Sequence, residues 1–353
     1  MSIRYRLLLA LGIAVCALAA QARNEHGPYL LAVAKLEHAL VVVDPHTLKV
    51  VARVPVGPDP HEAVASGDGS VAYVSNYGTG VYHTLARVDL RSLKVLKPID
   101  LGPLGGPHGL AFVDGEVWFT AEGAKAVGRL NPAGGAVDWI LGLGQNRTHM
   151  LNVRPDGGEV IAANVESGTM SIARRTAVKD DSLANLPPQA LARLKKMGMP
   201  KPPEFAWVVT NVQVGRRPEG FDVSPDGKEA WVANVADGTL SIIDLGTDSV
   251  VATLPANAKA PDRLRFTPDG KRVLVSSLGG PNMVVMDVAS RKVVKLVPVC
   301  SASGGVLVQP DGKRAFVACS PDDNIAVVDL ESLDVVGRIQ DIGEPDGLAW
   351  AGP

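Results

Sequence analysis

The sequence has little of what most enzyme families depend on. Only three of its 353 residues are cysteines, and aromatic residues make up 5% of it. It contains no Gly-x-Ser-x-Gly elbow, phosphate-binding loop, dinucleotide fingerprint or Cys-x-x-Cys-His haem attachment. These absences argue against an α/β-type serine hydrolase, a nucleotide-dependent enzyme of the usual kinds and a covalently held cofactor.

An excess of charge of one sign is also missing. The chain has 35 basic and 37 acidic residues, and its formal net charge is −2. General binding to nucleic acid or to an anionic membrane needs a basic surface, which this balance does not provide. We therefore expect no nucleic-acid partner.

Long apolar runs are absent except at the N-terminus. There Arg4 and Arg6 precede an apolar stretch that ends in the small-x-small site Ala-Gln-Ala at residues 20–22. This pattern predicts a signal peptide over residues 1–22, cleaved after Ala22, and a periplasmic or secreted protein without a membrane span. Cys16 raises the alternative of a lipoprotein, although the residue before it fits that signal poorly.

Turn residues, by contrast, are abundant, with 37 glycines and 26 prolines. An Asp-Gly pair recurs at intervals of 46, 42, 70, 43 and 42 residues, beginning at Asp68, Asp114, Asp156, Asp226, Asp269 and Asp311. Short runs around each pair alternate apolar with small or polar residues, which is typical of antiparallel strands. A period near 42 residues with several strands in each unit predicts a β-propeller.

The two ends of the chain supply one further unit. Residues 345–353 read as a first strand with nothing after it, and residues 29–54 read as strands two to four with nothing before them. Pairing these ends closes the ring and leaves no sheet edge at the junction. We therefore predict one all-β domain over residues 23–353, a seven-bladed β-propeller of four-stranded antiparallel blades that is closed by one C-terminal and three N-terminal strands.

The interval of 70 residues holds one insertion, at about residues 176–206. It falls between the third and fourth strands of blade 4, and "LPPQALARLKKMG" within it predicts a short helix after Pro188. The insertion is either a peripheral decoration or an element that binds a partner.

The stretches "SPDGKEAWVANVADGTLSIIDLGTDSVVATL" and "PDGKRAFVACSPDDNIAVVDLESLDVVGRI" resemble the YVTN repeat of secreted, YncE-like seven-bladed propellers, and "VAYVSNYGTG" carries the motif most clearly. The resemblance covers nearly all of the chain after residue 22 and implies the fold. It does not imply one function, because similar propellers include binding proteins, lactone hydrolases, antibiotic-opening lyases and the cofactor domains of quinone and haem enzymes.

Alignment of the repeats reveals a mostly polar position six or seven residues before the Asp-Gly pairs, where the chain enters the first strand. In blade order this position holds Asp346, His61, His108, His149, Glu219, Asp262 and Gly304. The first strands of a propeller line its central tunnel, so these residues are expected to encircle the tunnel mouth. Strict alternation along the strand would instead point the following residues, Glu62 and Arg263 among them, into the tunnel.

Three neighbouring imidazoles with a carboxylate nearby suit two kinds of chemistry. His61, His108 and His149 form a candidate first shell for a divalent transition metal. With Glu219 they are equally candidates for general acid–base catalysis. A purely structural role, hydrogen bonding to loop amides of the next blade, is the third alternative.

Longer segments add residues to the same face. The turn "NYGTGVYHTL" in blade 2 brings Tyr77, Tyr82 and His83 toward the histidines, and Arg147, Arg216 and Arg217 in the linkers are candidates to bind an anionic group. Cys300 and Cys319 also fall on this face. A disulfide is the leading interpretation, with free thiols or copper ligands as alternatives.

The sequence thus leaves two functions open. The first is a propeller, expected to be a monomer, that binds a small molecule or a periplasmic protein at the mouth through the ring residues, Glu62, Arg263, Tyr82 and His83. The second is a lactonase-like hydrolase or lyase that uses the same histidines, with or without a divalent metal. The ligand is not identified by the sequence.

Overall fold

The computed structural model describes residues 27–178, 186–198 and 203–352. The predicted signal peptide, with Cys16, lies outside these residues. Within them, no helix has the length and apolar character needed to cross a membrane.

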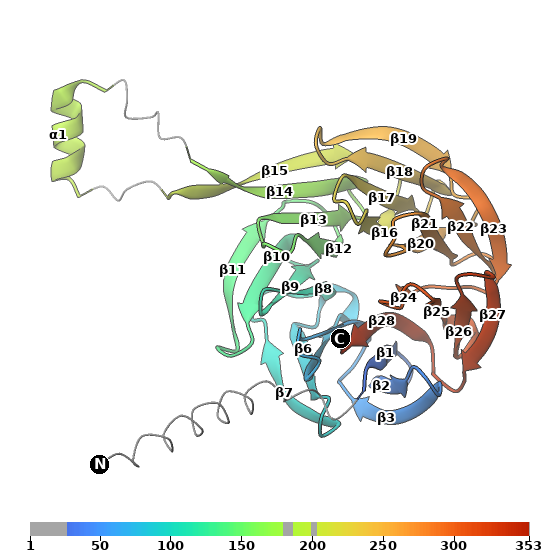
Figure 1. Cartoon of the computed structure of the whole chain (residues 1–353). Coiled ribbons are helices and arrows are strands. Elements are labelled where there is room, and N and C mark those ends of the chain that lie inside the picture. Colours follow the sequence, from blue (N-terminus) through green and yellow to red (C-terminus); the bar gives the residue numbers. More distant parts are fainter. Residues whose placement is uncertain (1–26, 179–185, 199–202, 353) are drawn as a thin grey trace, which may run out of the picture.

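Seven four-stranded antiparallel sheets stand around one axis (Figure 1). Blade 1 contains β28 (Pro345–Ala351), β1 (Tyr29–Ala34), β2 (Ala39–Asp44) and β3 (Lys49–Pro55). Blades 2 and 3 contain β4 (Pro60–Ala65), β5 (Val71–Asn76), β6 (Thr84–Asp89), β7 (Lys94–Asp100), β8 (Pro107–Val113), β9 (Glu116–Ala121), β10 (Ala126–Asn131) and β11 (Ala136–Gly142). Blades 4 and 5 contain β12 (Thr148–Val153), β13 (Glu159–Asn164), β14 (Thr169–Ala177), β15 (Phe205–Gln213), β16 (Pro218–Val223), β17 (Glu229–Asn234), β18 (Thr239–Asp244) and β19 (Ser249–Pro255). Blades 6 and 7 contain β20 (Pro261–Phe266), β21 (Arg272–Ser277), β22 (Asn282–Asp287), β23 (Lys292–Pro298), β24 (Val306–Val308), β25 (Arg314–Cys319), β26 (Asn324–Asp329) and β27 (Asp334–Ile339).

Blade 1 is closed by the two ends of the chain. The C-terminal strand β28 pairs antiparallel with β1, with Leu30 opposite Trp350 and Leu31 opposite Ala349. The predicted fold class is therefore confirmed, including closure by one C-terminal and three N-terminal strands.

The repeated Asp-Gly pairs form the hairpins between first and second strands. In blade 5, Gly227 has a φ of 70°, a backbone conformation that glycine adopts without strain. Asp226 accepts a hydrogen bond from the Ser224 hydroxyl (2.7 Å) and one from the backbone N–H of Lys228 (3.2 Å). The aspartate thus organises the turn, and the glycine supplies its left-handed residue.

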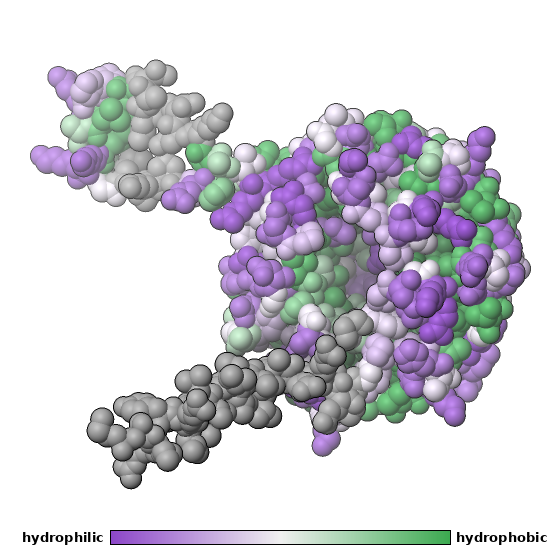
Figure 2. Space-filling view, viewed as in Figure 1, coloured by the Kyte–Doolittle hydropathy of each residue, from purple (hydrophilic) through white to green (hydrophobic). Residues whose placement is uncertain are grey.

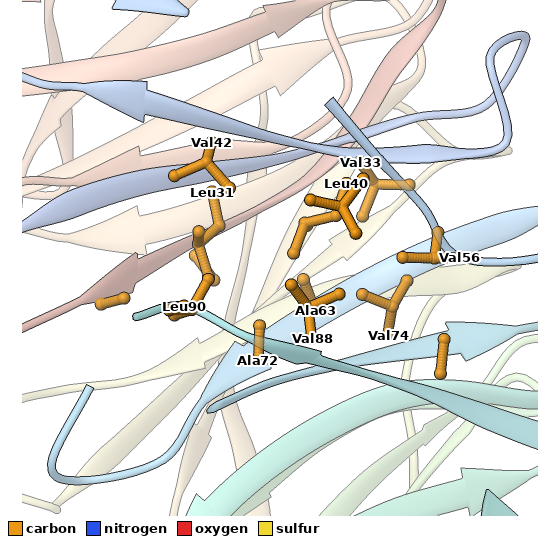
Figure 3. Packing of buried hydrophobic residues seen from close by; sticks show 14 residues of the cluster. Leu31, Val33, Leu40, Val42, Val56, Ala63, Ala72, Val74, Val88 and Leu90 are labelled. Atoms are coloured by element: carbon orange, nitrogen blue, oxygen red, sulfur yellow. The ribbon is translucent and has the colours of Figure 1, made fainter. Parts of the chain in front are cut away.

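The core lies in layers between successive blades. Between blades 1 and 2, for example, Leu31 and Leu40 face Val74 and Val88, and all four side chains are fully buried (Figure 3). Packing of this kind repeats around the ring, because apolar side chains on each strand alternate between the two neighbouring blades.

The insertion forms an arm that projects from blade 4 (Figure 1). Strands β14 and β15 extend to nine residues each, and helix α1 (Pro188–Lys196) lies at the far end. Residues 179–185 and 199–202 of the insertion lie outside the described residues. Hydrophilic and hydrophobic residues are interspersed on the arm and on the face of the propeller seen in Figure 2.

Candidate functional site at the mouth of the central tunnel

A β-bulge sits at the entrance of the first strand and decides where the ring residues point. In blade 2, Pro60 pairs with Asn76 and Ala63 pairs with Val74, so His61 and Glu62 together oppose one residue, Ser75. The same register shift occurs in the first strands of blades 1, 3, 4, 5 and 6. A bulge of this kind interrupts strict alternation and redirects a side chain. Both the ring residue and its successor therefore reach the mouth, which alternation alone did not predict.

The three ring histidines lie side by side. The ring centroids of His61 and His108 are 5.0 Å apart, and those of His108 and His149 are 3.6 Å apart. Tyr77, from the loop after β5, lies 4.8 Å from His61, 5.1 Å from His108 and 6.4 Å from His149. The residues that the repeat placed in three blades thus form one cluster around a tyrosine.

His149 is held between two carboxylates. Its Nδ1 lies 2.5 Å from Glu122 Oε1, and its Nε2 lies 3.2 Å from Glu219 Oε1. Burial alone would lower the pKa of His149, but the hydrogen bonds with Glu122 and Glu219 outweigh it and raise that pKa. Burial likewise opposes ionisation of Glu219, yet His149 and Arg147 bring the pKa of that carboxyl down to about 2. The two carboxylates therefore favour the protonated form of His149, in which both ring nitrogens donate.

The other two histidines are neutral. Burial lowers the pKa of His61 despite the nearby Asp346, and its nitrogens lie 3.0 Å from Asp59 Oδ1 and 3.4 Å from Asp346 Oδ2. Burial, together with His149 and His61, takes the pKa of His108 well below its usual value. Nδ1 of His108 is buried without a hydrogen-bond partner among the described residues.

An ion pair crosses the tunnel beneath the histidines. Arg263 Nη2 donates to Glu62 Oε1 at 2.8 Å, although the residues belong to blades 6 and 2, on opposite sides of the axis (Figure 1). Both side chains are buried, and burial raises the pKa of Glu62 against the effect of Arg263. The equivalent position is glycine in four blades, and a Cβ on Gly347 would stand 2.8 Å from Glu62 Oε2. The glycines leave room for this pair to fill the tunnel.

The two remaining ring carboxyl groups, Asp346 and Asp262, both lie close to Gly304. A Cβ there would lie 3.6 Å from Asp346 Oδ1 and 3.8 Å from Asp262 Oδ2. Burial raises the pKa of Asp262 to about 7, with Arg263 opposing this shift and Glu219 adding to it. Lys35 Nζ lies 3.6 Å from Asp346 Oδ2. Asp346 is therefore close to a cation, whereas Asp262 holds its proton up to near-neutral pH.

Tyr82 and His83 lie away from this cluster. Tyr82 packs against Gly78 within its own loop, and its side chain is partly exposed. His83 is exposed and pairs with Asp100 at 2.9 Å. Of the arginines considered from the sequence, Arg216 pairs with Asp237, while Arg147 joins the histidine network.

Two members of the network, Asp59 and Glu122, were not singled out from the sequence. Glu122 follows β9 directly, at the repeat position that Tyr77 occupies in blade 2 and that Val165 and Val235 occupy in blades 4 and 5. A carboxylate at a position that is apolar in blades 4, 5 and 6 was the available signal. The sequence did not predict the residues that Glu122 contacts, because they belong to different blades.

Above the network lies an open cleft of about 620 Å³, lined by Tyr77, Thr79, Gly80, Val81, Glu122, Gly123 and Arg147. Gly106 N–H donates to Tyr82 O at 2.7 Å and so ties the blade 2 loop to blade 3. A Cβ on Gly106 would be only 2.6 Å from Gly80 Cα, so this close approach requires glycine. The cleft therefore depends on a fixed loop.

Arg147 is the cation of this cleft. Its guanidinium lies 3.5 Å from Glu122, 3.7 Å from Glu166 and 3.8 Å from Glu219, longer than ideal hydrogen bonds. Its Nε, the atom nearest Glu122, is buried and makes no hydrogen bond in the described part of the chain, and 27% of the side chain is exposed. Burial lowers the pKa of Arg147, but Glu219 and Glu122 raise it overall, so it stays charged.

The donor set does not suit a metal ion. In the described ranges, no three His, Cys, Asp or Glu side chains are arranged to hold one. Carboxylates lie against both nitrogens of His149 and of His61, which leaves these rings no free nitrogen for a metal ion.

The two cysteines of the ring face form a disulfide. Cys300 follows β23, Cys319 ends β25, and their Cα atoms are 5.9 Å apart. The bond ties the linker between blades 6 and 7 to the inner part of blade 7.

Comparison with known proteins supports the family resemblance. Residues 200–314 match a family model described as YNCE-like beta-propeller. None of the curated proteins compared with the chain matches it significantly.

Several solved structures share the fold. A functionally unknown protein from Desulfotomaculum acetoxidans is 13% identical, with a TM-score of 0.72 over 92% of this chain and 99% of its own. Hydrazine synthase from Kuenenia stuttgartiensis is 18% identical, with a TM-score of 0.66 over 84% of this chain and 90% of its own. A candidate 6-phosphogluconolactonase from Bacteroides fragilis is 14% identical, with a TM-score of 0.70 over 93% of this chain and 99% of its own. At these identities the likeness concerns the fold alone.

Proposed function

We propose that this propeller is a periplasmic or secreted binding protein, and that it takes up a small molecule or a segment of a partner protein at the tunnel mouth. The observation that carries the proposal is the cleft beside Tyr77 and Arg147, above a histidine–carboxylate network whose groups are mutually paired. The buried groups are bonded to one another, and the accessible part of the site is a loop beside Arg147, a cation with no short ion pair.

Arg147 points to the chemistry of the ligand. A guanidinium whose existing ion pairs are long gains most from a group that accepts two parallel hydrogen bonds, such as a carboxylate. Exposed Val81 and Tyr82 on the adjoining loop offer apolar surface beside it. We infer a ligand that combines an anionic group with an apolar part.

The bonding and burial of the histidines argue against turnover at the same place. Both nitrogens of His149 lie against carboxylates, so neither is free to accept a proton from a substrate, and His108 is almost completely buried. A lactonase or lyase would need one of these imidazoles to reach a substrate. Binding without turnover fits the arrangement better.

The test is a thermal-shift screen with a panel of small carboxylates that bear apolar groups. At least one of them is expected to raise the unfolding temperature of the wild-type protein by a few degrees, because ligand binding to the native state alone stabilises it. Arg147→Ala should remove this shift. Arg216→Ala, which deletes the same charge on the same face away from the cleft, should retain it.

Two outcomes would overturn the proposal. One is a ligand-induced shift that survives in Arg147→Ala, and the other is the absence of a shift with every member of the panel. Hydrolysis of simple lactones that is lost in His149→Gln would favour the enzymatic alternative.

A further inference from the structure

Three of the five tryptophans meet in a cleft between blades 3 and 4, away from the tunnel mouth. Trp118 lies on β9, Trp139 on β11 and Trp207 on β15. The ring centroids of Trp118 and Trp139 are 5.2 Å apart, and those of Trp139 and Trp207 are 4.9 Å apart. The indoles thus run as a continuous aromatic wall from the second strand of blade 3 to the outermost strand of blade 4.

The wall borders a cavity of about 370 Å³, within the range of small-molecule sites. Besides the indoles, its lining includes Asp114, Glu116, Arg129, Asp156 and Arg175. Asp114 and Asp156 begin the Asp-Gly turns between first and second strands. The cavity therefore opens on the face opposite the mouth and is independent of the cleft at Arg147.

The inner end of the wall carries an unused hydrogen-bond donor. Trp118 is 2% exposed, and its Nε1 has no hydrogen-bond partner among the described residues. A Cβ on Gly157, another lining residue, would be 3.7 Å from Trp118 Cζ2, next to the nitrogen-bearing edge of the indole. Buried indole N–H groups usually find an acceptor. Trp231 does so, donating to Glu229 Oε2 at 2.8 Å.

The charges of the rim are largely paired among themselves. Arg129 binds Glu116 at 3.0 Å and Asp138 at 3.1 Å, and Asp156 accepts from Arg154 at 2.8 Å. These carboxylates still have lone pairs for hydroxyl donors. They also repel phosphate, which disfavours a nucleotide or a nucleic-acid strand despite the aromatic wall.

We propose that this cleft binds a neutral saccharide of one or two hexose units. The apolar C–H face of a sugar ring packs against the indoles of Trp139 and Trp207. One hydroxyl oxygen accepts the Trp118 Nε1 proton, and other hydroxyls donate to Asp114 and Asp156. Each polar feature of the cleft then has a partner, and the aromatic surface is covered.

The test follows the five indole N–H signals of the full mature chain by NMR after 15N-labelling of tryptophan. Maltose, cellobiose and N,N′-diacetylchitobiose are the probes, titrated at millimolar concentrations. At least one is expected to shift the Trp118, Trp139 and Trp207 signals in a saturable way. The Trp231 and Trp350 signals should not move. Trp350 is the matched control, since its Nε1 also lacks a partner but belongs to blade 1.

Two variants separate the donor from the stacking surface. Trp118→Phe keeps an aromatic ring but removes the N–H, and we expect at least a tenfold loss of affinity. Trp207→Ala changes an outer, half-buried residue and should weaken binding without unfolding the core. Arg147→Ala should leave saccharide binding unchanged, so this result does not depend on the function proposed for the mouth.

The proposal is overturned if none of the three disaccharides moves these signals. It is also overturned if Trp118→Phe, with the remaining indole signals still dispersed as in a folded protein, binds as tightly as wild type. Binding of a proline-rich peptide or a single-stranded oligonucleotide to the same indoles, without sugar binding, would replace the saccharide with another ligand class.

Discussion

At the mouth, burial and charged partners shift the pKa values of individual residues in opposite directions, and the larger effect decides each pKa. Glu219 contributes stability above its unfolded pKa near 4.5, and this contribution is lost as pH falls toward about 2. His149, with a raised pKa, contributes fully below its unfolded value near 6.5 and loses the contribution as pH rises through its folded pKa. The His149–Glu219 pair therefore stabilises the fold most between about pH 4.5 and 6.5.

The pKa of Asp262 is shifted upward, whereas most of the shifted aspartate pKa values in this protein are shifted downward. Burial raises its pKa to about 7, so its protonated form is favoured in the fold, and the associated stability is lost as pH rises from about 4 through 7. Asp262→Asn keeps the neutral shape. We expect the variant to exceed wild type in unfolding free energy at pH 8 by about 1–2 kcal/mol, with the gain shrinking toward pH 4. Urea unfolding at several pH values measures this.

The control for this experiment is a carboxyl group in an exposed turn. The Thr267 hydroxyl and the backbone of Lys271 lower the pKa of Asp269, so Asp269→Asn should give no gain at pH 8. If Asp262→Asn is less stable than wild type by the same amount at pH 8 and at pH 5, the pKa of Asp262 is not raised as stated.

At the scale of elements, the shape of the mouth depends on backbone features that repeat in most blades. The β-bulge brings two successive side chains to the mouth, and glycines let the blade 2 loop rest on blade 3. Asp262 on β20 and Asp346 on β28 consequently both lie close to Gly304.

Gly106→Ala tests the contact between loop and blade. The residue has a φ of 67°, and the added Cβ would stand 2.6 Å from Gly80 Cα, so both strain and a backbone clash result. We expect a loss of about 2–3 kcal/mol in unfolding free energy and faster proteolysis within residues 78–83. Gly115→Ala is the matched control, because its φ is 78° but its Cβ would meet nothing within 4 Å. Its loss should be about 1 kcal/mol, without new cleavage in the loop.

Equal losses in the two glycine variants would mean that the loop does not rest on Gly106. The disulfide between Cys300 and Cys319 is unaffected by either change, because it joins blades 6 and 7. A larger loss of unfolding free energy in Gly106→Ala than in Gly115→Ala therefore reports on the contact between Gly106 and Gly80.

For the whole molecule, closure of the ring is the decisive contact. Strand β28 covers the edge of β1, and Figure 1 shows the C-terminus inside the ring beside the first strands. Removal of residues 345–353 should abolish cooperative thermal unfolding, because it exposes a strand edge and opens the cores on both sides of blade 1. Calorimetry checks this, and a synthetic peptide of residues 345–353 should restore the transition.

The arm of blade 4 supplies the control for truncation. Val178 N–H donates to Glu204 O at 2.9 Å, so the two strands of the arm are paired at this point. A short turn can therefore join them here. Replacement of residues 179–203 by Gly-Gly should change the unfolding free energy by less than about 1 kcal/mol. A cooperative transition that survives loss of β28 would show that the ring closes without it.

The architecture follows from local pattern. The Asp-Gly period, the alternation around it and the unpaired strands at the two ends define seven blades and their closure, because turns and half-buried strands are encoded within a few residues. The same alignment brought His61, His108 and His149 to one position of the repeat. Their proximity then follows from the symmetry of the ring.

Only the tertiary structure decided which groups bond to each other. Glu62 and Arg263 are 201 residues apart and meet across the axis, and Glu122 reaches His149 from another blade. The bulge determines that both Glu62 and His61 face the mouth, and strand periodicity alone does not encode it. Protonation depends on burial and on partners from several blades at once, so the raised pKa values of His149 and Asp262 are properties of the folded ring.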